Sequence, residues 1–179
     1  MNPLALVAAA RPGLTARLVE ETHELVLHGG GEVFRLPLTE QAVARHALLV
    51  RALPALAVRL PVAVPRPRYV GVMDDGSTPF TAEPRLPGER MTAPPDGIAL
   101  GQLAGLLLAL RDVPAKEAQQ WGAAGDRDLH HAVLLHGALT PSALLADPAR
   151  GVLTGVVDWR PRLGEPAEDV RSLGVDPLG

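Results

Sequence analysis

The hydrophobic positions alternate near the start of the chain and then recur at helical spacing. Residues 17–36 predict two strands around a turn at 29–31, because three glycines supply the positive φ values of a tight turn between alternating segments. An amphipathic helix is expected over 39–53, where Thr39 can cap and apolar residues recur three and four positions apart. The chain therefore opens with a β-hairpin and a helix.

The middle and the last third continue this mixture of strands and helices. In the proline-rich stretch 54–97, "RYVGVM" and "PFTAEPRL" around "DDGS" predict a second hairpin. The run "IALGQLAGLLLAL" at 98–110 is too short to span a bilayer and predicts a buried helix, and a short helix with a loop follows over 112–130. Two or three short strands and a terminal helical turn complete an α+β pattern of two lobes.

Composition narrows the class of protein. Hydrophobic residues make up 47% and charged residues 21%, which is typical of a globular domain, while the aromatic share of 3% predicts a core of Ala, Leu and Val. The absence of cysteine excludes disulfides, thiolate zinc sites and cysteine nucleophiles. A net charge of -3 with interspersed signs predicts no nucleic-acid partner. No membrane segment or secretory signal is recognised, so a cytoplasmic protein is expected.

Three short motifs resemble catalytic sites but lack the partners that those sites need. In "HELVLH" the spacing from His23 to His28 is five, whereas two zinc ligands on one helical face need four. "HGGG" resembles an esterase oxyanion loop, but no serine lies on a nucleophile elbow. His130 and His131 could join His136 on a metal, but no carboxylate is fixed beside them.

The segment "VLLHGALTPSALLADPARGVLTGVVDW" at 133–159 has the layout of an active site without its reactive groups. An apolar run enters the His136-Gly137 turn, a polar loop follows, and a second apolar run ends in Asp158-Trp159. Such a layout is typical of a catalytic loop that precedes a metal-binding carboxylate. The loop from Gly137 to Leu144, however, contains no acid and no amide.

Residues 133–170 resemble the core of the aminoglycoside phosphotransferase and choline kinase branch of the protein-kinase-like folds. That family shows His-Gly-Asp, four residues, Asn, two apolar runs around a turn, Ile-Asp-Trp and Gly-x-Pro-x-x-Asp. This chain keeps the spacing, with "HGA" at 136–138, Ala143 at the Asn position, "VDW" at 157–159 and "GEPAED" at 164–169. Upstream, "EVFRLP" resembles the third strand, "EPRLPGERM" the hinge, and "LGQLAGLLLALRDVP" the helix that ends Leu-His-x-x-Pro.

The resemblance covers about residues 17–173 and implies a reduced protein-kinase-like fold of two lobes. The N-lobe is expected over 1–86 as a small antiparallel sheet with one helix. A truncated C-lobe is expected over 87–179, with a helix, a catalytic-loop hairpin and a terminal helical turn, and both lobes in one compact unit. The short interval between helix 98–111 and the loop, and the ten residues after Asp169, imply that the helices of an acceptor cleft are missing.

The resemblance also assigns roles to single residues. Arg35 stands at the place of the phosphate-gripping cation, and the hinge would bring Glu83 and Arg85 to the cofactor. Asp158 is the one remaining metal ligand. Two residues are expected to be structural: Asp169 would brace the catalytic loop and Gly164 belongs to the same motif. His136 is more often a turn-stabilising residue than a reactant.

Two further departures concern the N-lobe. His46 replaces the helix Glu that pairs with the strand cation, so Arg35 is expected to lose its ion-pair partner. Pro84 has no N–H, which removes a hinge donor.

The departures in the loop decide the expected function. Ala138 replaces the carboxylate that accepts the proton of the attacking hydroxyl, and Ala143 replaces a metal-binding amide. A positioned base contributes typically 10² to 10⁴ in rate. We expect no catalytic residue, and ATP and magnesium bound weakly or not at all.

The sequence therefore predicts a catalytically impaired pseudokinase that acts as a binding or partner module for an unidentified small molecule or protein. Two alternatives remain open. One is an active ATP-dependent phosphotransferase with rearranged residues, and the other is a kinase-like fold repurposed for a different reaction or for small-molecule binding. Self-association is also left open, because missing C-terminal helices would expose apolar surface.

Overall fold

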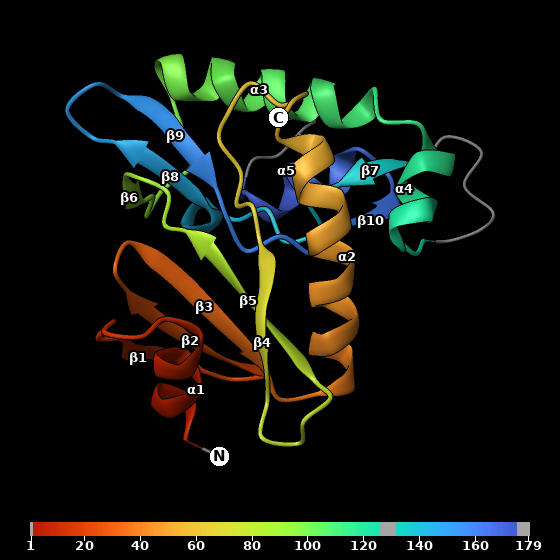
Figure 1. Ribbon diagram of the computed structural model, residues 1–179. Coiled ribbons are helices and arrows are strands. Elements are labelled where there is room, and N and C mark those ends of the chain that lie inside the picture. The colour runs from red at the N-terminus through yellow and green to blue at the C-terminus, as the bar shows by residue number, and fades with distance from the viewer. Residues whose placement is uncertain (1, 126–131, 175–179) are drawn as a thin grey trace. The chain divides into compact units, whose positions relative to one another are not determined.

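The computed structural model describes residues 2–125 and 132–174 (Figure 1). The chain divides into two compact units. Unit 1 contains Met1–Arg51 and Arg66–Arg85, and unit 2 contains Ala52–Pro65 and Leu86–Gly179. Each unit combines strands with helices, so the expected α+β class is confirmed. The sequence had predicted one compact unit with its lobe boundary after residue 86.

Residues 52–65 lie in unit 2, although the sequence placed them in the N-lobe. The backbone N–H of Val156 donates to the Ala63 carbonyl at 2.9 Å, next to a strand of unit 2. Arg59 forms an ion pair with Glu117 at 2.8 Å. These long-range contacts hold the segment on unit 2, and local patterning gave no sign of them.

Unit 1 is a five-stranded antiparallel sheet with two helices, in the strand order β1-β2-β3-β5-β4. Its elements are α1 (Pro3–Ala10), β1 (Arg17–Glu21), β2 (Glu24–Gly29), β3 (Glu32–Pro37), α2 (Glu40–Leu56, whose last residues belong to unit 2), β4 (Arg68–Val72) and β5 (Pro79–Pro84). Thr39 caps α2, because its Oγ1 accepts the Ala42 N–H at 3.1 Å. Helix α1 was not predicted, although Asn2 caps it in front of Pro3.

The stretch 17–28, expected to be one strand, forms two strands that pair with each other. The chain turns at Thr22-His23, where the Thr22 N–H donates to the Glu24 carbonyl at 3.2 Å, and Leu18 lies opposite Leu27. The alternation of apolar residues continues through this turn and therefore concealed it. A three-stranded meander replaces the predicted hairpin.

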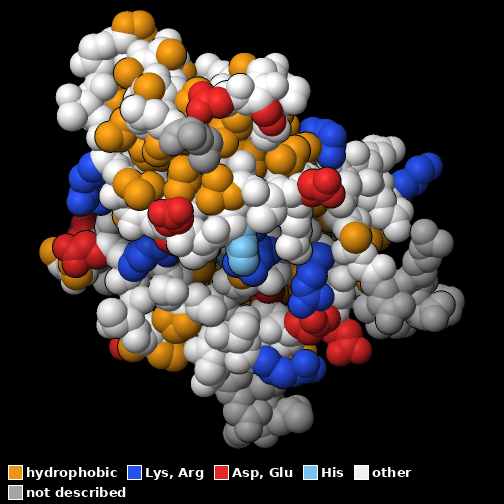
Figure 2. All heavy atoms as spheres, turned by 90° about the horizontal axis from the view of Figure 1, so that it is seen from below, with side chains coloured by type: hydrophobic (Ala, Val, Ile, Leu, Met, Phe, Trp, Pro, Cys, Tyr) orange, Lys and Arg blue, Asp and Glu red, His pale blue; other side chains and the backbone are white. Residues whose placement is uncertain are grey.

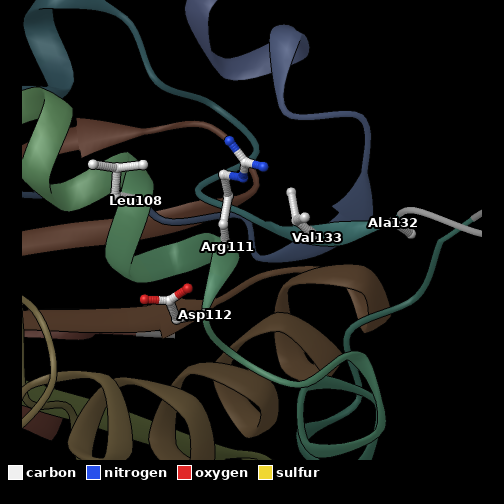
Figure 3. Close-up of a pocket in the computed structure, with 5 residues that line it drawn as sticks. All are labelled: Leu108, Arg111, Asp112, Ala132 and Val133. Atoms are coloured by element: carbon white, nitrogen blue, oxygen red, sulfur yellow. The ribbon is translucent and has the colours of Figure 1, made fainter.

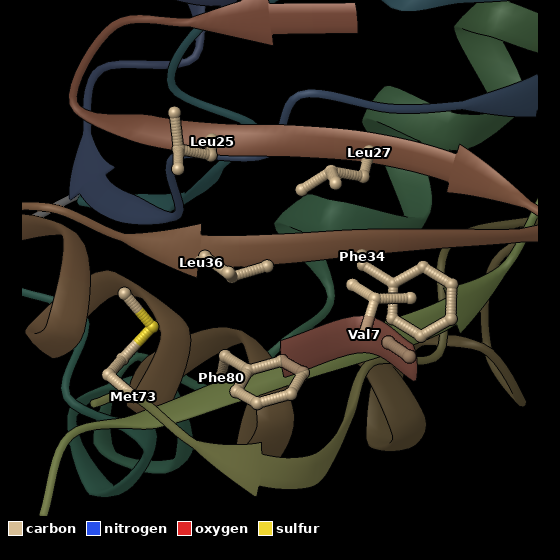
Figure 4. Packing of buried hydrophobic residues seen from close by; sticks show 8 residues of the cluster. Val7, Leu25, Leu27, Phe34, Leu36, Met73 and Phe80 are labelled. Atoms are coloured by element: carbon tan, nitrogen blue, oxygen red, sulfur yellow. The ribbon is translucent and has the colours of Figure 1, made fainter. Parts of the chain in front are cut away.

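The strand periodicity of two gives the sheet of unit 1 an apolar face and a charged face. The apolar face packs with α1 into one buried cluster (Figure 4): Val7, Leu25, Leu27, Phe34, Leu36, Met73, Phe80 and Ala82. The opposite face carries Arg35 from β3 and Glu83 from β5, with Glu24 at the start of β2. This second face positions the charged residues described below.

Unit 2 contains two small sheets, of order β10-β7 and β6-β8-β9, together with helices. Its elements are β6 (Glu89–Arg90), α3 (Gly97–Arg111), α4 (Ala115–Trp121), β7 (Val133–Leu135), the 3-10 turn η1 (Pro141–Ala143), β8 (Leu144–Asp147), β9 (Val152–Val156), β10 (Arg162–Gly164) and α5 (Ala167–Ser172). Helix α3 packs on β7 and β9 through a buried face that includes Leu103, Leu106 and Leu110.

Helix α3 is not buried on all sides, as its sequence had suggested. Ile98 is 65%, Leu100 48% and Leu108 59% exposed. Over residues 2–125 and 132–174, no single helix has the length and hydropathy of a membrane span. Helices α3 and α4 together meet both criteria, but the pair is bent by 87°.

On the face shown in Figure 2, basic and acidic side chains are intermixed.

Candidate functional site

The His136-Gly137 turn follows β7 and is held by the carboxylate of Asp169 in α5. Asp169 Oδ2 accepts the His136 N–H at 2.7 Å, and Oδ1 accepts the Gly137 N–H at 3.0 Å. Burial raises the pKa of Asp169, although these two backbone N–H groups favour its charged form. Gly137 has φ 82°, and a Cβ there would lie 2.0 Å from the Arg160 carbonyl oxygen, so only glycine fits this turn.

His136 is buried and hydrogen-bonded at both ring nitrogens. Nε2 lies 2.9 Å from the Val157 carbonyl oxygen, and Nδ1 accepts the Ala138 N–H at 3.3 Å. Burial lowers the pKa of His136 to about 4, despite the hydrogen bond to Val157. The imidazole is therefore neutral at pH 7, with its proton on Nε2, and it contacts the Trp159 ring with centroids 4.4 Å apart and planes tilted by 48°. These contacts suit a structural residue and leave no nitrogen for a metal.

The two alanines stand in this ordered loop where the sequence placed them. Ala143 ends η1 with 1% of its surface exposed, and its carbonyl accepts the Val157 N–H at 2.9 Å. Ala138 follows the His136-Gly137 turn directly. Asp147, the carboxylate nearest in sequence, is bonded to the backbone of its own turn, accepting the Ala149 N–H at 3.0 Å. The loop keeps its backbone frame and presents no carboxylate of its own.

Gly164, expected to be structural, lies in β10 opposite Val133 of β7. A Cβ at this position would lie 2.7 Å from Leu135 Cδ1 and 2.5 Å from Glu168 Oε1. The residue allows the ends of these two side chains to lie against the backbone of β10, and a larger side chain would displace them.

Asp158 follows β9 in the left-handed backbone region, with φ 61°. Its Oδ2 accepts a hydrogen bond from Arg90 Nη1 at 2.5 Å, and the same nitrogen donates to the Ser142 carbonyl at 2.5 Å. The sequence did not single out Arg90, because a two-residue strand has no periodic signal.

These residues do not fit a magnesium ion. Mg²⁺ prefers six oxygen ligands in near-octahedral geometry. Asp158 is paired with a cation, Ala138 and Ala143 supply no side-chain oxygen, and in 2–125 and 132–174 no group of three acidic or histidine side chains could hold a metal. His130 and His131 lie outside the described residues.

In unit 1, Arg35 lies between two carboxylates, and the expected loss of its ion-pair partner is wrong. Arg35 Nη1 contacts Glu24 Oε1 and its Nε contacts Glu83 Oε1, each at 3.0 Å. Arg35 pairs with Val26 on one side and with Thr81 on the other, so the residues two positions away, Glu24 and Glu83, reach it diagonally. Both carboxylates come from neighbouring strands, whereas the family resemblance had implied one carboxylate from a helix.

Helix α2 still takes part, through His46. His46 Nε2 lies 2.6 Å from Glu24 Oε2, and Arg45 contacts the same oxygen at 3.1 Å. Burial alone would raise the pKa of Glu24, but the hydrogen bond from His46 and the charges of Arg35 and Arg45 outweigh it and lower the pKa to about 2. His46 therefore does not take the role of the acidic residue that is missing from α2. It links α2 to Glu24, a carboxylate on β2.

The predicted hinge residues differ in their surroundings. Glu83 is 5% exposed, and its carboxylate is held by Arg35. Arg85 is exposed and anchored through its backbone, because its N–H donates to the Gly31 carbonyl at 2.8 Å. Pro84 lies opposite Glu32 at the end of β5. The structure brings Arg35 and Glu83 together, and a cofactor-binding role for Arg35, Glu83 and Arg85 stays a prediction.

Two pockets lie beside α3 in unit 2. One of about 640 Å³ is formed at the end of α3 and the start of β7 (Figure 3) by Leu108, Arg111, Asp112, Ala132 and Val133. The other, of about 310 Å³, is mainly apolar and includes Leu107, Leu134 and Val170. Neither pocket includes Asp158, Ala138 or Ala143, but the second is lined by Asp169, the residue that holds the His136-Gly137 turn.

Comparison with solved structures shows which fold this is. A mutant of aminoglycoside 2'-phosphotransferase-IIIa in its GDP complex matches with a TM-score of 0.82 at 20% identity, over 94% of this chain and 74% of that chain. The apoenzyme of the macrolide 2'-phosphotransferase MphH from Brachybacterium faecium matches with 0.75 at 25% identity, over 93% and 74%. The streptomycin-ATP-APH(2'')-IIa ternary complex matches with 0.63 at 13% identity, over 91% and 71%.

No family model and no curated protein matches the sequence. The structural similarity nevertheless spans nearly the whole chain and agrees with the resemblance of its motifs. The chain has the kinase-like fold of the aminoglycoside and macrolide phosphotransferases.

Proposed function

We propose that this chain is a pseudokinase, a kinase-fold module that binds a nucleotide without transferring its phosphate and acts as a binding or partner module. One observation carries the proposal. The catalytic loop keeps its frame, with Asp169 holding the His136 and Gly137 N–H groups, while alanine stands at 138 and at 143. A loop that keeps this backbone frame but lacks a catalytic carboxylate at 138 and a metal-binding amide at 143 favours nucleotide binding over phosphoryl transfer.

Nucleotide binding is supported by the similar structures and by one cation of this chain. Structures of the same fold contain GDP or ATP. Arg35 is a permanently charged, planar group that suits a phosphate, and its contacts with Glu24 and Glu83 fix its orientation on the sheet. These two carboxylates also offset its charge, so we expect a modest affinity.

Impaired phosphoryl transfer follows from the residues at 138 and 143. The loss of a positioned base lowers a rate by typically 10² to 10⁴. Since kinases turn over at about 1 to 100 per second, and a missing metal ligand removes further charge stabilisation, we expect turnover below about 0.1 per second.

Two measurements on the purified chain test this proposal. Thermal unfolding should shift upward with ATP or GTP, because a ligand at a hundred times its Kd adds about 2.7 kcal/mol of stability. Phosphate release in the presence of Mg²⁺, with and without kanamycin or a macrolide as acceptor, should stay below about 0.1 per second. Faster release would show an active phosphotransferase, and the absence of any thermal shift would refute nucleotide binding.

A further inference from the structure

The guanidinium of Arg90 bridges two oxygens of the loop in unit 2. Its Nη1 lies 2.5 Å from the carboxylate of Asp158 and 2.5 Å from the carbonyl oxygen of Ser142. Asp158 follows β9, Ser142 belongs to η1, and Arg90 comes from β6, which pairs with β8 between them. One positively charged group therefore joins the metal-ligand position to the loop that precedes it.

A carboxylate and a backbone carbonyl are oxygen donors of the kind that a divalent cation takes. Here the two oxygens face a guanidinium, whose planar N–H donors and permanent charge suit such a pair. Ala143, next to Ser142, supplies no third donor. The site is thus built for an arginine and is too poor in oxygens for a metal.

We infer that Arg90 takes the place of a divalent cation at Asp158, and that phosphate binding by this chain is therefore independent of divalent metal. The part that concerns phosphate rests on the proposed function. The two contacts use a single nitrogen of a group with five N–H donors, and 50% of the Arg90 side chain is exposed. Arg90 can therefore hold Asp158 and still donate to an anion.

The metal part is tested without any nucleotide, by titrating the chain with Mn²⁺ and following the signal of free Mn²⁺ by electron paramagnetic resonance. Four proteins are compared: the wild type, Arg90→Gln, Ala143→Asn and the double variant. We expect the double variant, which regains an amide oxygen and loses the competing cation, to bind Mn²⁺ at least about tenfold more tightly than Ala143→Asn alone.

Equal affinity of these two variants would overturn the inference, and so would Mn²⁺ binding by the wild type that Asp158→Asn abolishes. Ala143 is 1% exposed, so its substitution can disturb folding. If it does, Arg90→Gln is compared with the wild type, because the loss of the competing cation should still increase the weak binding of Mn²⁺ at Asp158. We expect Arg90→Gln to be about as stable as the wild type, because exposed ion pairs contribute little to stability.

The phosphate part is tested by titrating the chain with ATP in EDTA and again in Mg²⁺. We expect the wild type to bind equally in both, and Arg90→Gln to bind about tenfold more weakly in EDTA, as for the loss of one charge-assisted contact. Arg150→Gln is the matched control, because Arg150 is exposed in the turn between β8 and β9.

Binding that requires Mg²⁺, or an Arg90→Gln variant that binds ATP like the wild type, would overturn this part. If no protein binds ATP in either buffer, the proposed function and the phosphate part both fail. The Mn²⁺ titration still decides whether Arg90 excludes a metal from Asp158.

Discussion

The buried imidazole of His136 makes the stability of unit 2 depend on pH. Burial lowers its pKa from 6.5 to about 4. Between pH 6.5 and pH 4 the imidazole is therefore protonated in the unfolded chain and neutral in the folded chain. The stabilisation is complete above pH 6.5 and is lost as the pH falls towards 4. We expect the free energy of unfolding to fall by up to about 1.4 kcal/mol per pH unit in this window.

The measurement is chemical denaturation at several pH values between 7 and 4, with His136→Gln and His23→Gln as a pair of variants. His23 is exposed in the turn between β1 and β2. The difference in stability between wild type and His136→Gln should shrink as the pH falls, whereas the difference for His23→Gln should stay nearly constant. A pH-independent difference for His136→Gln would show that its imidazole titrates normally.

Among the polar side chains that hold the His136-Gly137 turn, the carboxylate of Asp169 in α5 is expected to be the most sensitive to substitution. Asp169→Ala leaves the N–H groups of His136 and Gly137 without their acceptor, and hydrogen bonds to charged groups contribute about 1.5 to 3 kcal/mol each. We expect a loss of roughly 3 to 5 kcal/mol in the free energy of unfolding, measured by urea denaturation.

Two further variants isolate the role of Asp169. Asp169→Asn keeps one acceptor oxygen and should lose about half as much stability as Asp169→Ala. Glu168→Gln is the control in the same helix, because it removes the charge of a partly exposed ion pair with Arg162, which contributes at most about 1 kcal/mol, and keeps an amide oxygen for the Glu165 N–H. Equal losses for Asp169→Ala and Glu168→Gln would mean that Asp169 does not brace the loop.

At the scale of elements, Glu24 connects the sheet of unit 1 with α2. It contacts Arg35 on β3 and both Arg45 and His46 on the helix. Removing one partner of a buried ion pair costs about 3 to 5 kcal/mol, but Arg35 keeps Glu83, so we expect Glu24→Gln to lose about 2 to 3 kcal/mol of stability.

Denaturation at pH 7 and at pH 3 checks this expectation. The pKa of Glu24 is lowered to about 2, so its contribution is present above about pH 4.5 and decreases as the pH falls towards 2. The loss caused by Glu24→Gln should therefore be smaller at pH 3 than at pH 7. Glu20→Gln, on the exposed strand β1, should change little at either pH, and a Glu24→Gln variant that behaves like it would refute the connecting role.

The same elements show why one part of the site could be predicted and another could not. The loop residues at 136, 138, 143 and 158 were found because their spacing along the chain carries the motif. Glu24 was missed because the turn at Thr22-His23 interrupts a strand pattern that looked continuous, and only the true register places it beside Arg35. Arg90 was missed because β6 pairs with β8, more than fifty residues away, and leaves no local pattern.

At the scale of the whole molecule, the order of six weak motifs was sufficient to predict the fold. The similar solved structures share only 20% to 25% identity in the better matches, yet their TM-scores are 0.75 and 0.82. A fold tolerates such divergence because its core needs hydrophobic residues of suitable size at the right period. The assignment of 52–65 to unit 2 depends on long-range contacts such as Val156 to Ala63, which no period reveals.

The retained frame and the two alanines lead to a single expectation for the molecule in solution. We expect the chain to bind a nucleotide and to release it with its γ-phosphate intact. The most direct test is equilibrium dialysis of the purified chain against ATP labelled at the γ-phosphate, in Mg²⁺, followed by separation of the nucleotides on the protein side.

We expect the label to be retained by the protein as intact ATP over many minutes. If labelled free phosphate appears faster than about 0.1 per second per chain, the loss of catalysis is contradicted. Equal label on both sides of the membrane would contradict nucleotide binding itself.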